Sequence, residues 1–157
     1  MAITGAMVEA DAVSFTDPDI LWDLTPSSSS FANIESWVTG ITVTGGDVPI
    51  TNFSTFTVPM VFVGKRNPFT IVVEMAYTEA ALTNPFKQIY DLFDANPGLL
   101  QDVQWHPEGA ATGNYIYTSS GARLIGCTLP QGTSSGSDPT LFTATLQAPS
   151  IAISVGA

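Results

Sequence analysis

Charged side chains are scarce in this chain of 157 residues. Asp, Glu, Lys and Arg make up 11% of it, whereas soluble domains average about 25%. Apolar residues make up 45%, so a monomer would have few ionised groups with which to hydrate its surface. Large subunit interfaces are depleted in charge at their centres. We therefore expect much of the surface to meet other copies of the chain; hydration by Ser, Thr, Asn and Gln is the alternative.

Basic residues are the scarcest charged type. Four Lys and Arg stand against fourteen Asp and Glu, which gives a net charge of −10. Binding to DNA depends on Lys and Arg that neutralise phosphates, so this balance argues against nucleic acid as a bound ligand. The acidic charge is compatible with a surface along which DNA slides without binding. It is equally compatible with a role in solubility alone.

Cysteine and long apolar runs are also lacking. Cys127 is the one cysteine, so no intrachain disulfide forms, which is typical of a reducing compartment. Its place in an apolar strand pattern predicts an inert thiol rather than a nucleophile. No apolar run approaches the ~20 residues of a membrane span, and the N-terminus has no secretory pattern. We expect no association with a membrane.

Residues that carry chemistry are few. The single histidine, His106, lies two residues from Glu108, but a zinc site takes three or four ligands. There is no Gly-x-Ser-x-Gly elbow and no phosphate-binding loop. We therefore expect no enzyme activity, no metal and no cofactor. Trp105, Tyr115 and Tyr117 suggest either a platform for a sugar or core packing, and their alternation favours the core.

One helix is predicted, over residues 84–98. Asn84 is suited to the N-cap and Pro85 to the first helical position, while Asn-Pro-Gly at 96–98 ends the pattern. The apolar stripe recurs at i, i+3, i+4 and i+7. It consists of Phe86, Ile89, Tyr90 and Phe93. Since the rest of the chain reads as strands, we expect this stripe to pack across a β-sheet.

The remaining pattern is that of strands in a single domain spanning residues 1–157. Residues 1–34 read as an irregular segment, with a short strand possible at 8–15. The strongest alternation is at residues 69–78. Further strands are expected at 37–44, 50–63, 99–105, 114–118, 122–129, 141–148 and 151–155. The fold class is thus mainly β, an antiparallel sandwich or barrel with one packed α-helix.

The segment between the first long strand and residues 69–78 has an unusual charge. Residues 48–73 contain no acid, yet they hold Lys65 and Arg66, two of the four basic residues. Pro59 interrupts the strand pattern at 50–63, and residues 64–68 read as the turn that follows it. A cationic, apolar hairpin on an acidic protein suggests a docking element; an ordinary hairpin with a solvated turn is the alternative.

The order of these elements resembles a known family. Glu-Ser-Trp-Val-Thr-Gly at 35–40 leads into the hairpin, the strand at 69–78 and the helix. Gly-Ala-Arg-Leu-Ile-Gly-Cys-Thr-Leu-Pro at 121–130, a polar loop and Leu-Phe-Thr-Ala-Thr-Leu at 141–146 then follow. Over residues 35–155 the chain resembles a major tail (tail tube) protein of a long-tailed bacteriophage, a family related in fold to the tube of type VI secretion systems.

The resemblance implies a non-enzymatic virion protein, assembled in the host cytoplasm, whose hexameric rings stack into a tail tube. Strands of neighbouring subunits would join into one barrel, and the genome would pass through its channel without specific binding. The expected partners are other copies and other tail proteins. A head decoration or tail-completion protein, or a carbohydrate-binding β-sandwich, are the alternatives.

Two sets of residues are assigned on this basis. Docking between rings would use the hairpin residues Pro59, Met60, Val61, Phe62, Lys65 and Arg66. The face of the strand at 69–78 that carries Thr70, Glu74 and Thr78, with Val72 and Ala76, would line the channel. Phe69, Ile71, Val73, Met75 and Tyr77 would then lie in the core.

Overall fold

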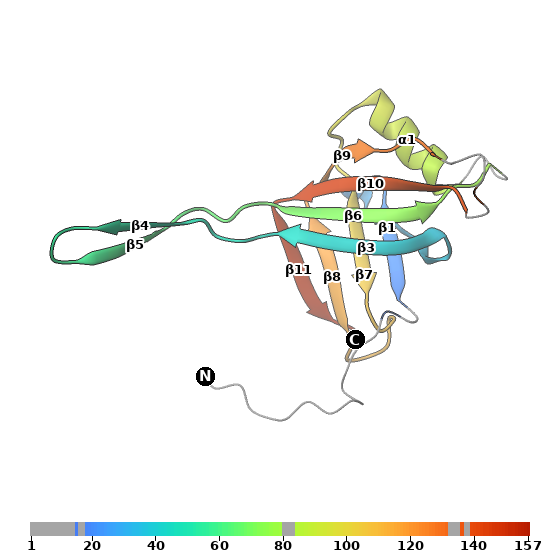
Figure 1. The fold of residues 1–157 in the computed structure, drawn as a ribbon. Coiled ribbons are helices and arrows are strands. Elements are labelled where there is room, and N and C mark those ends of the chain that lie inside the picture. Colours follow the sequence, from blue (N-terminus) through green and yellow to red (C-terminus); the bar gives the residue numbers. More distant parts are fainter. Residues whose placement is uncertain (1–14, 16–17, 80–83, 132–135, 137–138) are drawn as a thin grey trace.

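Two antiparallel sheets form the body of the protein (Figure 1). The computed structural model describes residues 15, 18–79, 84–131, 136 and 139–157. One sheet has the order β11-β8-β7-β1-β2, and the other has the order β3-β6-β10-β9. The strands of the first are β1 (Asp19–Asp23), β2 (Phe31–Asn33), β7 (Asp102–His106), β8 (Tyr115–Ser120) and β11 (Ser150–Val155). Those of the second are β3 (Val38–Gly45), β6 (Phe69–Ala76), β9 (Arg123–Cys127) and β10 (Leu141–Ala148).

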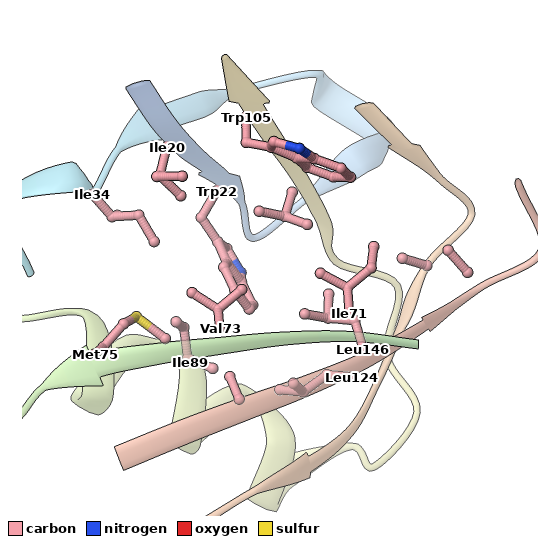
Figure 2. Close-up of a cluster of buried hydrophobic side chains, with 14 of the residues drawn as sticks. Ile20, Trp22, Ile34, Ile71, Val73, Met75, Ile89, Trp105, Leu124 and Leu146 are labelled. Atoms are coloured by element: carbon pink, nitrogen blue, oxygen red, sulfur yellow. The ribbon is translucent and has the colours of Figure 1, made fainter. Parts of the chain in front are cut away.

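The core lies between the two sheets. Along β6 the side chains of Ile71, Val73 and Met75 are fully buried, whereas Glu74 is exposed. Successive side chains of a strand point to opposite faces, so this alternation buries one face of β6. Trp22 of β1 points into the same core from the other sheet, as Figure 2 shows. The expected β fold is confirmed, with one α-helix among the described residues.

The helix α1 (Pro85–Ala95) lies against the four-stranded sheet on the side of β9 (Figure 1). Asn84 caps it, because its Oδ1 accepts a hydrogen bond of 2.9 Å from the backbone N of Lys87. Ile89 reaches the core, and Phe86 packs edge-on against Phe142 of β10. The predicted apolar stripe is therefore the packed face, with Tyr90 and Phe93 half-buried on it.

Residues 19–33 differ from the expected irregular segment. They form β1 and β2, separated by a 3-10 turn at Pro26–Ser28, and a second such turn, Glu35–Trp37, leads into β3. β1 supplies Ile20 and Trp22 to the core. Its five residues are too few to stand out as a periodic pattern, and Asp-Pro-Asp at 17–19 is a stronger turn signal. The strand considered at 8–15 lies outside the described residues except for Phe15, which is in a turn.

The expected position of the hairpin turn is wrong. The chain reverses between β4 (Ile50–Ser54) and β5 (Pro59–Val63), where Thr55 N donates to the carbonyl of Val58 at 3.0 Å. Thr55 Oγ1 also accepts from the N–H of Val58. A hydroxyl thus organises a turn that contains no Gly, Asn or Pro between the strands. Residues 64–68 do not reverse the chain; they run back toward β6.

Candidate assembly surfaces

A long arm, residues 46–68, projects from the body between β3 and β6 (Figure 1). Its stem is held by backbone hydrogen bonds from Gly64 N to Pro49 O at 2.7 Å and from Asn67 N to Asp47 O at 2.9 Å. At its base Gly45 has φ +84°, and a Cβ there would lie 2.4 Å from the carbonyl oxygen of Pro68. The arm therefore leaves the body at a point that only glycine accommodates.

Both faces of the arm are apolar and exposed. The register places Ile50, Val61 and Val63 on one face and Phe53, Met60 and Phe62 on the other. These six side chains are between 36% and 71% exposed, and Phe56 at the tip is fully exposed. An isolated two-stranded hairpin is marginally stable in water. An arm of this kind would be stabilised by a partner that covers its apolar side chains.

The basic residues of the arm lie in its stem, not at its tip. Lys65 and Arg66 are exposed in the segment that leads from β5 back to β6, and neither forms a salt bridge within the described part of the chain. Residues 48–73 carry a net charge of +2, and the rest of the chain carries −12, which sums to −10. Positive charge is therefore concentrated in residues 48–73, although Asp47 at the start of the arm is acidic.

The outer face of the four-stranded sheet is rich in hydroxyl groups. Register places Thr70 and Glu74 of β6 on this face, in line with Thr44 of β3 and with Thr143 of β10. The Glu74 carboxylate accepts a hydrogen bond of 2.7 Å from Thr39 Oγ1. Thr78 lies beyond the end of β6 and is half-buried. Of the predicted channel residues, Thr70 and Glu74 thus share one sheet face.

This sheet also ends in strands with unpaired backbone. In the described part of the chain, β3 pairs with β6 alone. β9 pairs with β10 on one side, and on its other side Arg123 forms a single bridge to Leu100. The rest of that outer edge of β9 has no partner strand in the described part of the chain. Exposed edges invite pairing with another chain. Lys and Pro often mark an edge strand, but neither occurs in β3 or β9, so the sequence did not indicate these edges.

The residues considered for chemistry are not brought together. His106 is buried, with Nε2 3.1 Å from Gln104 Oε1 and Nδ1 3.5 Å from Asp19 Oδ2, whereas Glu108 is exposed on the following loop. Cys127 is half-buried, and burial raises the pKa of its thiol to about 11. Among the described residues, no group of three or more His, Cys, Asp or Glu is placed to hold a metal ion.

The aromatic residues considered for sugar binding are mostly packed. Trp105 is buried and stacks on Tyr117, with ring centroids 5.4 Å apart and planes 9° from parallel. Tyr115 is the exposed member of the three. A buried indole offers no face to a sugar ring, so the structure favours core packing. In the described part of the chain, no helix is long and apolar enough to cross a membrane.

Comparison with known proteins gives a fold but no family. No family model and no curated protein matches the sequence. A chain in the PVC sheath-tube complex of an extracellular contractile injection system, in its extended state, matches with a TM-score of 0.67 and 11% identity, over 96% of this chain and 99% of that one. A chain in the tube-terminating cap of the anti-feeding prophage matches with a TM-score of 0.65 and 16% identity, over 99% and 100%.

A third similar structure is the tail of an empty gene transfer agent particle with C6 symmetry. The TM-score is 0.56 at 11% identity, over 88% of this chain and 96% of that chain. At these identities the likeness shows a shared fold. The fold of this chain is thus one found in chains of contractile injection systems and of a gene transfer agent tail.

Proposed function

We propose that this chain is a structural subunit of a phage or phage-like tail tube, in which rings of it stack around a channel for the genome. The observation that carries the proposal is the arm with two exposed apolar faces, on a fold shared with tube and tail chains. Two flanking partners, as a stack of rings provides, would cover both faces of the arm.

The edges of the four-stranded sheet support ring formation. Pairing β3 of one copy with the free outer edge of β9 in the next would extend the sheet from copy to copy. Closure of a sheet into a barrel removes exposed edges altogether. The contact joins two different surfaces, so it forms a ring when the rotation closes. We take six copies per ring, in keeping with the C6 symmetry of the gene transfer agent tail.

The hydroxyl-rich face would then line the channel. Six copies carry 6 × −10 = −60 charges per ring, and DNA adheres to proteins chiefly through Lys and Arg. A wall of Thr side chains with Glu74 offers hydration with one cation per copy, Arg123 of β9, which register places opposite Gln147 on this face. The genome could therefore slide along it. The role is structural, the location is the virion tail, and the partners are further copies and other tail proteins.

Electron microscopy of the purified full-length protein in negative stain tests the proposal. We expect tubes built of stacked rings that lengthen as protein concentration rises. Sedimentation velocity at the same concentrations measures the assembled fraction. A compact monomer at high concentration, even when other tail proteins of the same particle are supplied, would overturn the proposal.

A terminator of the tube is the second candidate. The chain in the anti-feeding prophage cap matches with a TM-score of 0.65, against 0.67 for the chain in the sheath-tube complex, so the fold alone separates the two roles poorly. A terminator caps a tube with one ring. Single closed rings that bind the ends of tubes made by another protein, and never lengthen, would favour this role.

A further inference from the structure

The core-facing side of the five-stranded sheet continues beyond the part that the second sheet covers. Register places Ile153 of β11 opposite Tyr117 of β8, and Val155 opposite Tyr115. Tyr117 stacks on the buried Trp105, so all four side chains lie on the face that elsewhere builds the core. Tyr115, Ile153 and Val155 are nevertheless 57–62% exposed. We name these three residues the β11 patch.

The pattern of β11 is that of a strand with one buried face, of which the described residues cover only the first part. Ile151 packs against the core, and Ile153 and Val155 continue the same apolar face. Ala152 and Ser154 occupy the opposite face. Such alternation is typical of a strand with one face packed. Among the described residues the packing stops after Ile151, which leaves the last two apolar positions of β11 exposed.

We propose that the β11 patch binds the arm of a second copy of this chain. This inference rests on the proposed tube, and it names the surface that receives the arm there. The arm of the same chain does not occupy the patch, because both surfaces remain exposed within one molecule. Each copy thus has one arm and one patch, and contact between two such different surfaces propagates from copy to copy.

Charge favours an arm as the occupant. β8 and β11 contain no charged residue, so an apolar face can lie on them without burying an ion. Glu108 is exposed on the loop before β8. Asn114 Nδ2 donates a hydrogen bond of 3.0 Å to the backbone carbonyl oxygen of Glu108. When the apolar faces meet, Lys65 and Arg66 in the stem would face an acidic body: the described residues outside 48–73 hold ten Asp and Glu against Lys87 and Arg123, which gives 2 − 10 = −8. Complementary charge of this kind fixes orientation.

Complementation between two defective variants tests the inference. The arm variant is Phe53→Thr/Phe62→Thr, and the patch variant is Ile153→Thr/Val155→Thr. Thr keeps the β-branched or strand-favouring character at each position. Each variant alone should lose tubes, with the concentration needed for assembly raised ~100-fold by the loss of two buried apolar side chains.

Mixing the two variants should restore the contact between the arm of the patch variant and the patch of the arm variant, and no other contact between arm and patch. The arm variant has an intact patch, and the patch variant has an intact arm. An equimolar mixture should therefore give a species of twice the mass of either variant alone, by sedimentation velocity, and no tubes. Ala152→Ser/Ser154→Thr on the other face of β11 is the matched control and should assemble as the unmodified protein does. Should the patch variant fail to fold by circular dichroism, Tyr115→Thr on β8 probes the same patch.

The outcomes separate this inference from the proposed tube. Tubes from the patch variant, or a mixture that sediments as the sum of its components, would overturn the inference and leave the tube in place. Absence of tubes from the unmodified protein would overturn the tube. A doubled species in the mixture would then still support the contact between arm and patch, and its absence would overturn both.

Discussion

The indole Nε1 of Trp22 donates a hydrogen bond of 2.7 Å to Oε1 of Gln101, and both side chains are fully buried. The bond joins β1 to the residues that precede β7, at the centre of the core between the two sheets. The other end of the same amide, Nε2, has no hydrogen-bond partner among the described residues. Gln101 therefore supplies an acceptor to Trp22 and leaves one buried donor unsatisfied.

Replacement of these two residues should have unequal effects on stability. Gln101→Met removes the acceptor of Trp22, which costs ~1–3 kcal/mol for an unpaired donor, but it also removes the unsatisfied Nε2. The two effects oppose each other, so the net change in the free energy of unfolding should stay below about 1 kcal/mol. Trp22→Phe should cost ~2–4 kcal/mol, because it leaves both ends of the amide unpaired and opens space in the core.

Urea denaturation of both single variants and of the double variant measures this difference. The coupling free energy from the cycle should be about 1 kcal/mol, the typical net value of one buried hydrogen bond. Trp105→Phe is the control, since it removes an indole from the same core without touching this pair. A cycle with no coupling would show that the Trp22–Gln101 bond contributes nothing to stability.

The sequence predicted elements whose pattern is long and one-sided. Eight alternating residues defined β10, and a capped apolar stripe defined α1. It missed β1, where two Asp residues flank three apolar ones. It also misplaced the hairpin turn, because Pro59 looked like an interruption although it begins β5, and because Thr55 rather than Gly or Asn organises the reversal.

The assembly surfaces were predictable only in part. The acid-free window at residues 48–73 indicated the arm, because charge is a property of the residues themselves. Free strand edges and the β11 patch depend instead on which strands lie at the ends of sheets. In β11 the alternation of Ile151, Ile153 and Val155 predicted a strand and no more. No residue type in that strand indicates that the described part of the chain covers only the first of the three.

The thiol of Cys127 should react slowly at alkaline pH. Burial raises its pKa from 9.0 to about 11, so folding favours the neutral form, and only the thiolate is nucleophilic. At pH 9 a thiol with pKa 9 is about half ionised and one with pKa 11 about 1%, so alkylation of the folded chain should be ~50-fold slower than that of the unfolded chain. Mass spectrometry after iodoacetamide treatment, with and without urea, measures both rates. Equal rates would show that Cys127 is neither buried nor perturbed.

Reversal of the charges in the stem should uncouple stacking from ring formation. Lys65→Glu/Arg66→Glu changes the net charge of residues 48–73 from +2 to −2 and would place like charges opposite the acidic body of a neighbouring copy. Like charges brought together cost several kcal/mol at an interface. We expect rings that do not stack, seen by electron microscopy at concentrations where the unmodified protein forms tubes.

Lys87→Glu is the control for this reversal. Lys87 lies on the exposed face of α1, where its Nζ pairs with Asp91 one turn along the helix, and its loss should leave tubes unchanged. Tubes of full length from the stem variant would refute a role for Lys65 and Arg66 in stacking. Tubes lost equally in both variants would point to net charge, rather than to the stem, as the cause.

A basic residue on the face that we assign to the channel should make tubes retain DNA. Glu74→Lys changes the charge of each ring by 6 × 2 = 12, if rings hold six copies and Glu74 lines the channel. DNA bound through Lys is released as salt rises, with losses on the order of 10³-fold between about 50 and 200 mM when several phosphates are contacted. DNA retained at the lower salt concentration should also be protected from nuclease, because the tube wall would enclose it.

Asp94→Lys makes the same change of charge at an exposed position of α1, which packs on the side of β9. DNA bound by this control should be released by the same rise in salt, but nuclease should degrade it, since it would lie on the outer surface of the tube. The contrast between the two variants therefore reports where Glu74 points, independently of how strongly either one binds. Nuclease-sensitive DNA on Glu74→Lys tubes would place this sheet face outside the channel and remove the assignment of Thr70 and Glu74 to its wall.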